Sequence, residues 1–407
     1  MMRVAFIIYR KNHYRCLAPA VEEAMARGWS AECWHDWSHP RRGGKASEFP
    51  DTVPPLRHGS PRIRTFQGAN DLAVQLGADP PDVIIALDPP EVKAAASAPW
   101  LWLQYSADIL FYRTPDFFLE KADTLATYSP YWSERLEERH RESGQGPAVR
   151  RRTRAVGMPE LDVIPRIEPG EVRRRFGLPA DRPVVLYLPF PLYSNPSTFW
   201  LRNVFRPSTH LGQATRTLLA RRMEYWQDVR RRWNDKHLVE AVRNFCDRAG
   251  AALVMKSRLK DPIPRYAVRR AERALYDPSY YPPTILELLS VASLCIHACS
   301  TSVFEAAACR VPSLCLYPAD ADVGLPAFVH EFVHNLKPDG IYNFPGAAYG
   351  VPLREAFDGF ARWRLEDFPL HAEGRRGYME RFLGFDDGRS SARLLDLARD
   401  LAEGRPA

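Results

Sequence analysis

Small polar side chains separate two apolar stretches in the last third of the chain. Leu294–Ile296 is an apolar run of the β type, Ser300-Thr301-Ser302 follows it, and Val303–Ala308 has the composition of a helix. The first N–H groups of a helix have no partner within it, and they carry the positive end of its dipole. Such a turn suits a phosphate group. The stretch therefore predicts a nucleotide-diphosphate site in which Ser300, Thr301 and Ser302 donate hydrogen bonds.

Structural explanations of the same stretch stay open. Ser302 and Glu305 have the S-x-x-E spacing of a capping box, which would account for both residues. Cys295, His297 and Cys299 alternate, and this spacing places them on one face of a strand. A metal site needs further ligands in suitable geometry, so buried cysteines and a hydrogen-bonded histidine are the simpler interpretation. We therefore expect neither a metal nor a bound cofactor.

Short apolar runs alternate with helical patterns along the chain. This alternation predicts an α/β protein with parallel sheets and helices on both faces. The Pro-, Gly- and charge-rich segment Ser38–Arg64 predicts a loop. The expected strands are Arg3–Tyr9, Ala31–Trp34, Val83–Leu87, Trp100–Tyr105, Thr124–Thr127, Pro183–Leu188, Ala252–Lys256, Leu294–Ile296 and Leu314–Tyr317. The main expected helices are Leu17–Ala26, Asn70–Leu76, Leu238–Ala249, Ile285–Ala292 and Ser390–Ala402.

A length of 407 residues predicts two domains. The polar stretch that ends near residue 154 marks the boundary. We expect an N-terminal Rossmann-like domain over residues 1–155, a linker over 156–182 and a second Rossmann-like domain over 183–385. Residues 386–407 would form a C-terminal helix that could cross back to the first domain.

Composition narrows the class of protein. The fractions of 45% hydrophobic and 26% charged residues are typical of a soluble globular chain. No stretch approaches the roughly 18 apolar residues of a membrane span. Seven cysteines without a CxxC pair favour reduced thiols and a cytoplasmic location. The net charge of 56 − 49 = +7 favours an anionic partner, although a solvated arginine-rich surface explains it equally well.

Arginines and aromatic residues are interleaved over residues 194–235. Such a segment could bind a phosphorylated acceptor, RNA or a membrane surface, and the last would place the protein at the inner face of a membrane. An amphipathic helix over Thr215–Trp233, with packed aromatics and solvated arginines, is slightly favoured. The sequence contains no recognisable RNA-binding module, so nucleic acid ranks last among the partners.

Segments from both halves resemble nucleotide-sugar enzymes of the GT-B fold. Val4–Ile7, the loop with His13 and the helix that ends at Gly28 are similar to the opening unit of these transferases. Val156–Asp162 and Arg175–Leu178 are similar to the interdomain segment of UDP-N-acetylglucosamine 2-epimerases and related transferases. The resemblance covers about residues 3–320. It implies two Rossmann-like α/β domains that face a cleft.

The stretch Ser293–Tyr317 resembles the donor-site element of those epimerases, of CDP-glycerol glycerophosphotransferases and of capsule polysaccharide transferases. The stretch departs from the pattern in two places. The phosphate loop reads Ala298-Cys299-Ser300 where many relatives have a glycine, and Arg310 replaces a second glycine. A missing glycine limits how closely a phosphate approaches the backbone. Serine-rich loops occur in the glycerophosphotransferase-like branch, so the change points to that branch more than to a lost site.

The resemblance implies roles for single residues of the donor site. Glu305 would hold the ribose hydroxyls, His297 would lie near the diphosphate, and Tyr280 would contact the base. Lys256 and Arg258 end a buried run, and ligands of parallel sheets bind at that edge, so both could neutralise the diphosphate. Lys256 and Arg258 could equally be surface residues that only increase solubility. The chain has no DxD motif, which agrees with metal-independent transfer.

The reaction implied by the resemblance is inverting transfer of a sugar from a nucleotide-diphosphate donor to an acceptor hydroxyl. The acceptor would be anionic or lipid-linked, in surface polysaccharide or secondary-metabolite glycosylation. His13 is the first candidate for the base, because imidazole titrates near neutral pH, and Asp88 and Asp108 follow strand-like runs at the same edge. His13 could equally be a surface loop residue, and Asp88 a turn residue.

Three other functions stay open. A CDP-glycerol-type glycerophosphotransferase and a UDP-sugar 2-epimerase would use the same donor element. A protein without catalytic activity could instead bind an anion, RNA or a membrane through residues 194–235. The products, or the lack of turnover, would separate these functions.

Overall fold

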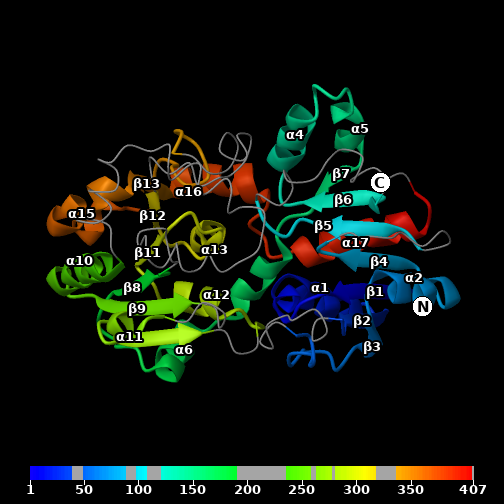
Figure 1. Cartoon of the computed structure of the whole chain (residues 1–407), viewed down its shortest axis with the longest axis horizontal. Helices are drawn as coiled ribbons and strands as arrows, with labels where there is room; N and C mark the ends of the chain where they lie inside the picture. Colours follow the sequence, from blue (N-terminus) through cyan, green and yellow to red (C-terminus); the bar gives the residue numbers. More distant parts are fainter. Residues whose placement is uncertain are drawn as a thin grey trace, which may run out of the picture. The chain divides into compact units, whose positions relative to one another are not determined.

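The chain contains two parallel sheets, each within its own compact unit (Figure 1). The computed structural model describes residues 1–38, 49–88, 98–107, 121–189, 235–257, 263–276, 280–317 and 336–405. Unit 1 comprises residues 1–167, 277–286 and 377–407, and unit 2 comprises residues 168–276 and 287–376. The predicted α/β class with parallel sheets is confirmed. Each unit draws on separated parts of the sequence.

Unit 1 has a seven-stranded sheet in the order β3-β2-β1-β4-β5-β6-β7. All neighbouring strands are parallel. The order reverses direction between β1 and β4, so the carboxyl ends of these two strands form a switch point, where ligands of such sheets bind. The strands are β1 (Arg3–Ile8), β2 (Ser30–Asp36), β3 (Arg62–Phe66), β4 (Val83–Ala86), β5 (Trp100–Leu103), β6 (Thr124–Thr127) and β7 (Thr153–Ala155).

Helices cover both faces of this sheet. On one face, buried side chains of β1 and β4 pack against Leu72 and Leu76 of α2. On the other face, α17 contacts α1 and β4. The Asp162 carboxylate accepts the N–H groups of Ser390 and Ser391 at 3.0 and 2.6 Å, which fixes the start of α17. The helices are α1 (Tyr14–Ala26), α2 (Ala69–Ala78), α4 (Pro130–Arg139), α5 (Gly146–Arg151) and α17 (Ser390–Ala402).

Unit 2 has a six-stranded sheet in the order β10-β9-β8-β11-β12-β13. Its neighbouring strands are also parallel. Here the switch point lies between β8 and β11. The strands are β8 (Val184–Tyr187), β9 (Ala252–Ser257), β10 (Arg273–Tyr276), β11 (Leu294–His297), β12 (Ser313–Tyr317) and β13 (Ala348–Pro352). Its helices include α6 (Pro169–Phe176), α10 (Asp235–Arg248), α11 (Arg265–Val268), α13 (Ser302–Ala308) and α15 (Leu353–Arg362), and α12 (Thr284–Leu289) and α16 (Ala372–Tyr378) extend into unit 1.

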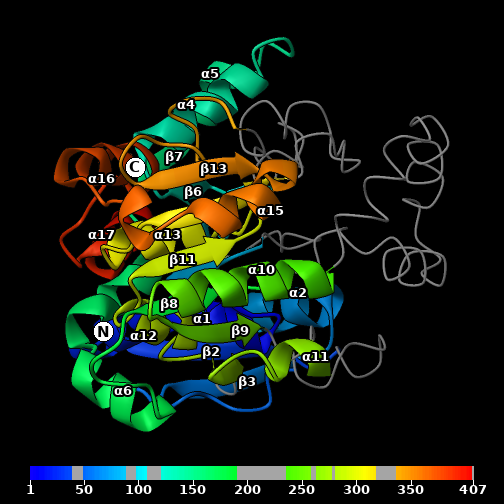
Figure 2. The same cartoon turned by 90° about the vertical axis from the view of Figure 1, so that its left-hand side faces the viewer.

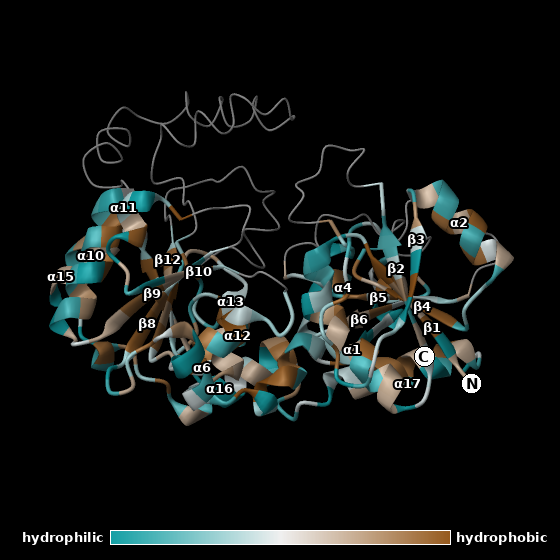
Figure 3. Cartoon of the chain, turned by 90° about the horizontal axis from the view of Figure 1, so that it is seen from below, coloured by the Kyte–Doolittle hydropathy of each residue, from teal (hydrophilic) through white to brown (hydrophobic). Residues whose placement is uncertain are grey.

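The two faces of the second sheet differ in chemistry. Apolar side chains of β8, β9, β11 and β12 form one core with α10 and α15, which lie in front of the strands in Figure 2. Figure 3 shows apolar strands inside the unit, with α12 and α13 beyond the opposite face. Side chains alternate along a strand, so Lys256, His297 and Cys315 lie on this opposite face. The polar residues of the predicted site therefore share one face of the sheet.

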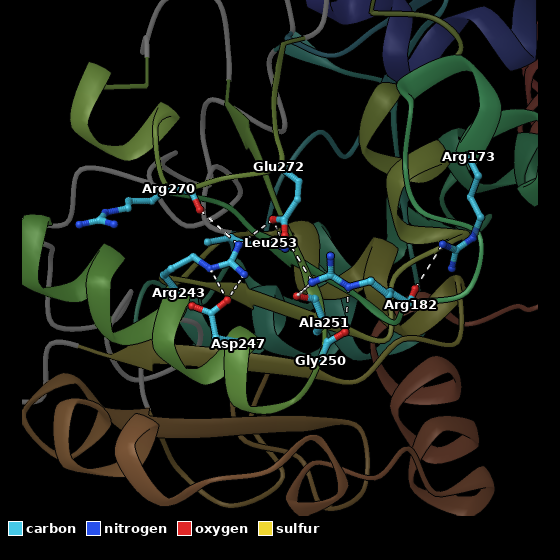
Figure 4. Close-up of polar contacts among 9 residues, drawn as sticks. All are labelled: Arg173, Arg182, Arg243, Asp247, Gly250, Ala251, Leu253, Arg270 and Glu272. Carbon is cyan, nitrogen blue, oxygen red and sulfur yellow. Dashed lines mark hydrogen bonds and ion pairs between the residues drawn. The ribbon is translucent and has the colours of Figure 1, made fainter.

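A network of charges holds the amino-terminal edge of the second sheet (Figure 4). The Glu272 carboxylate accepts the Leu253 N–H at 2.7 Å and pairs with Arg243 at 2.8 Å. Arg182 donates to the carbonyls of Gly250 and Ala251 at 3.0 and 2.8 Å. These charged and polar groups are hydrogen-bonded or paired with one another, so the network stabilises this edge of the sheet.

One sequence prediction about the fold is wrong. Residues 62–64 were expected in a loop, but they begin β3, the edge strand of the first sheet. Arg62 and Arg64 pair with the buried Glu32 of β2 at 3.6 and 3.1 Å. Ion pairs with a neighbouring strand therefore hold this edge, and such a strand lacks the apolar pattern that predicts a buried one.

Candidate functional site

Four residues form a row across the carboxyl edge of the second sheet. The register pairs Tyr187 with Met255 and with Ile296, so the next residues, Lys256 and His297, lie level with Leu188 between them. Cys315 pairs directly with His297 on the other side. Adjacent strands are about 4.8 Å apart, so the Lys256 and His297 backbones are separated by roughly 10 Å. This row lies at the switch point of unit 2.

His297 anchors the loop that follows β11. The side chain is fully buried, and its Nδ1 accepts the N–H of Ser300 at 3.3 Å. A ring nitrogen that accepts a hydrogen bond carries no proton, so the neutral imidazole here has its hydrogen on Nε2. The ring also lies 6.1 Å from that of Tyr342. His297 thus fixes the position of the loop through its hydrogen bond to Ser300.

The loop over residues 298–301 is held largely by its own groups. The Ser300 hydroxyl accepts the N–H of Ser302 at 3.2 Å, and the Ser300 carbonyl accepts that of Val303 at 3.2 Å. The Phe304 N–H bonds to the carbonyl of Thr301 at 3.0 Å. The Thr301 N–H makes no hydrogen bond within the described residues and remains available to a ligand.

The predicted capping box is wrong. Helix α13 begins at Ser302, and its N-cap residue, Thr301, makes no side-chain capping bond. Ser302 is thus the first residue of the helix instead of its N-cap, so Ser302 and Glu305 do not have the positions of a capping box. Glu305 is fully buried on α13, where its charge acts on the Cys295 thiol. Burial, and then the Glu305 charge, raise the pKa of Cys295.

The spacing of Cys295, His297 and Cys299 predicted that all three share one face of a strand. The structure contradicts this prediction for Cys299. Strand β11 ends at His297, and Cys299 lies in the loop with a left-handed φ of 42°. The Cys299 N–H donates to the sulfur of Cys315 at 3.4 Å, and the Tyr342 hydroxyl donates to the Cys299 carbonyl at 2.9 Å. Within the described ranges, no group of three His, Cys, Asp or Glu side chains is arranged to hold a metal ion.

The switch point of unit 1 brings two predicted catalytic residues to neighbouring strands. His13 ends the 3₁₀ helix η1 (Lys11–His13), just after β1, and Asp88 follows β4. His13 is only 1% exposed, which excludes the surface-loop interpretation. Its ring centroid lies 6.2 Å from that of Tyr9 and 5.6 Å from that of Tyr105. The imidazole is therefore held by aromatic side chains at the edge where the fold places ligands.

Tyr105, which packs against His13, and the ion pair of Arg15 and Glu160 were not predicted from the sequence. Tyr105 accepts a hydrogen bond from the Asn12 amide at 2.8 Å, and burial raises the pKa of Tyr105 to about 12. Arg15 pairs with the fully buried Glu160 at 2.7 Å. Glu160 lies far from Arg15 in sequence, so only the fold brings this pair together. Of these residues, only Arg15 could have been predicted from the sequence, because it follows His13 by two positions.

The structure describes the remaining predicted residues to different extents. Asp108, Arg258 and nearly all of the segment 194–235 lie outside the described residues. Tyr280 is buried, has a left-handed φ of 62° and belongs to unit 1, whereas the donor loop belongs to unit 2. Ser300 and Thr301 are half-buried, and Ser302 and Lys256 are buried.

Comparisons with known proteins identify the fold. No protein-family model and no curated protein sequence matches the chain. The wall teichoic acid polymerase TagF superposes with a TM-score of 0.59 at 14% identity, over 99% of this chain and 89% of TagF. A UDP-N-acetylglucosamine 2-epimerase gives a TM-score of 0.58 at 11% identity, over 99% of this chain and 97% of the epimerase. The co-structure of S. aureus MnaA with UDP gives 0.53 at 12% identity, over 99% and 97% of the two chains.

The chain therefore has the GT-B-like fold of these nucleotide-sugar enzymes. TagF has also been solved after a soak with CDPG. Among the described residues, no helix is both long and apolar enough to span a membrane.

Proposed function

We propose that the protein is a glycosyltransferase that moves a sugar from a nucleotide-diphosphate donor to an acceptor hydroxyl. The observation that carries the proposal is the hydrogen bond from the Ser300 N–H to His297. It holds two hydroxyls and the available Thr301 N–H at the switch point of unit 2, in a fold shared with a protein solved with UDP. Lys256 lies on the same face of the sheet and supplies positive charge.

The donor loop would stabilise the leaving diphosphate. Negative charge develops on the diphosphate as its bond to the sugar breaks. Fixed N–H and hydroxyl donors and a nearby ammonium group stabilise such charge without reorganising during the reaction. Thr301, Ser300 and Lys256 take these roles. The site needs no metal in this proposal, because protein groups supply the positive potential.

His13 would act as the general base. It takes the proton from the acceptor hydroxyl as the oxygen attacks the anomeric carbon, and inversion follows from attack opposite the leaving group. Tyr9 and Tyr105 hold the ring in position. Asp88 follows the neighbouring strand β4 and is the second candidate for the base. An anionic or lipid-linked acceptor fits the net positive charge of +7.

A second candidate function is transfer of an alcohol phosphate from a CDP-activated donor. The hydroxyl-bearing loop and the similarity to TagF favour it over epimerisation. In this reaction the acceptor oxygen would attack phosphorus instead of a sugar carbon. Product analysis separates the two functions, because one forms a glycoside and the other a phosphodiester.

A thermal-shift screen with UDP, CDP, GDP, ADP and dTDP tests the proposed donor site. A nucleotide that binds only the folded protein raises the Tm by several degrees at about 100-fold above its Kd. We expect one nucleotide to do so. His297→Leu should reduce the shift, because leucine cannot accept the Ser300 N–H, whereas His297→Asn keeps an acceptor and should retain part of it.

His13→Gln is the matched control in unit 1. It should preserve the nucleotide shift and abolish turnover, since His13 is proposed to act on the acceptor. No shift with any nucleotide, or equal shifts in His297→Leu and the wild type, would contradict the donor site.

A further inference from the structure

Two thiols meet directly beneath the proposed donor loop. Cys315 is fully buried on β12, and Cys299 is half-buried in the loop. The Cys299 N–H donates to the Cys315 sulfur at 3.4 Å, and the two thiols also share a hydrogen bond. Neither cysteine forms a disulfide in the structure. The two sulfurs are therefore neighbours, and one of them is accessible from the loop.

The surroundings of the two thiols shift their pKa values in opposite directions. Burial opposes ionisation of Cys315, but the hydrogen bonds that its sulfur accepts from Cys299 lower the pKa of Cys315 below its ordinary value. The hydrogen bond to Cys315 and burial together raise the pKa of Cys299. The thiolate is the reactive form of cysteine, so Cys315 is the more readily ionised of the two sulfurs and Cys299 the one that holds its proton more tightly.

We propose that Cys299 and Cys315 form a reversible disulfide with a peroxide as the oxidant, and that this disulfide switches off nucleotide binding. The first half concerns the thiol chemistry alone, and the second half rests on the proposed function of the loop. The feature that carries both halves is the contact of Cys315 with the residue that directly precedes Ser300.

The oxidation balances in two steps. The Cys315 thiolate attacks one oxygen of hydrogen peroxide, breaks the O–O bond and becomes a sulfenic acid with release of hydroxide. The Cys299 sulfur then attacks the Cys315 sulfur, forms the S–S bond and expels the sulfenic oxygen, which leaves as water with the Cys299 proton. The two sulfurs lose two electrons and the peroxide gains them. A dithiol such as dithiothreitol reverses the reaction by exchange.

A disulfide changes the geometry of the donor loop. It requires Cβ atoms about 3.8 Å apart, closer than two unbonded thiols need. The bond would tie Cys299 to β12, and the change in Cys299 would act on Ser300 because it is the next residue. We expect this change to weaken the bond from the Ser300 N–H to His297 and to shift the Thr301 N–H. The loop then no longer presents its donors to a diphosphate.

Disulfide mapping tests the first half and does not depend on any nucleotide. The full chain is treated with hydrogen peroxide, free thiols are alkylated, and the peptides are sequenced by mass spectrometry. We expect a cross-link between Cys299 and Cys315 that dithiothreitol removes, and its loss in Cys299→Ser and Cys315→Ala. Cys309→Ala is the matched control, because Cys309 is another half-buried thiol nearby. A sulfenic or sulfinic acid without the cross-link would overturn the proposal.

Nucleotide titration tests the second half. The nucleotide that raises the Tm in the screen is titrated into reduced, oxidised and re-reduced protein. Oxidation should weaken binding about tenfold or more, the effect of losing one hydrogen bond to a charged group, and reduction should restore it. Equal affinity in the cross-linked and reduced proteins would overturn the switch. If the cross-link forms but no nucleotide binds the reduced protein, the proposed function fails and the switch fails with it.

Discussion

Buried histidines show what a sequence leaves open at the scale of single residues. His13 was identified from its position after the first strand and His297 from the resemblance of its segment to a donor site, and both lie at switch points. Their burial and hydrogen bonds depend on residues distant in sequence, such as Tyr105 beside His13 and Tyr342 beside His297. The residue types were therefore predictable, whereas their surroundings required the fold.

His35 should make the stability of the protein depend on pH. Burial lowers the pKa of His35 to about 4, against the smaller opposing effects of the Pro50 carbonyl and Asp51. The ordinary value is about 6.5, so between pH 6.5 and 4 the unfolded chain binds more protons than the folded protein. The contribution of His35 is fully present above pH 6.5 and is lost as the pH falls toward 4. The free energy of unfolding should drop by about 3 kcal/mol over this window.

Urea denaturation at pH 7.5, 6 and 5 measures this effect. His35→Gln is the comparison, because glutamine does not titrate and can still bond to the Tyr14 hydroxyl, which lies 2.6 Å from His35 Nε2. The variant should show a smaller dependence on pH. A residual slope is expected, since burial also lowers the pKa of His140 to about 4. Equal slopes for the variant and the wild type would contradict the assignment to His35.

At the scale of elements, buried strands were predictable and charged ones were not. The last predicted helix, Ser390–Ala402, has the observed bounds, and so does the strand Thr124–Thr127. Both have an apolar pattern that matches their periodicity. The edge strand β3 was missed because its side chains are mostly exposed and pair with charges on β2. Sequence periodicity reports burial, so an edge held by ion pairs gives little signal.

The backbone of Gly157 lies very close to the first residue of α17 in unit 1. It has a φ of +92°, and a Cβ atom there would lie 2.3 Å from the Ser390 hydroxyl at the start of α17. Gly157→Ala should therefore reduce the free energy of unfolding by about 2–3 kcal/mol, from backbone strain and from overpacking. Gly28→Ala is the matched control, since Gly28 has a φ of +71° with no atom within 4 Å. It should cost only about 1 kcal/mol. Equal losses in chemical denaturation would show that the contact with Ser390 is unimportant.

At the scale of the whole molecule, unit 1 contains both the N-terminal and the C-terminal segments of the sequence. Residues 377–407 belong to unit 1. The Ser129 hydroxyl donates to the carbonyl of Arg381 at 2.6 Å, and the Trp132 indole donates to that of Phe382 at 2.8 Å. Arg27 pairs with Asp396 at 2.8 Å. These contacts cross most of the chain length, so unit 1 cannot be complete until its last segment is in place.

Deletion of residues 389–407 should therefore weaken unit 1 selectively. The deletion removes Leu394, Leu395 and Ala398, which are fully buried, and a single lost leucine already costs about 2–5 kcal/mol. Hydrogen exchange reports local unfolding, so the amides of β1 and β4 should lose protection while those of β8, β9 and β11 keep theirs. Deletion of residues 404–407 alone, which leaves α17 intact, should change neither set. Equal loss of protection in both sheets would mean that the units unfold together, and unchanged protection of β1 and β4 would mean that α17 adds little to unit 1.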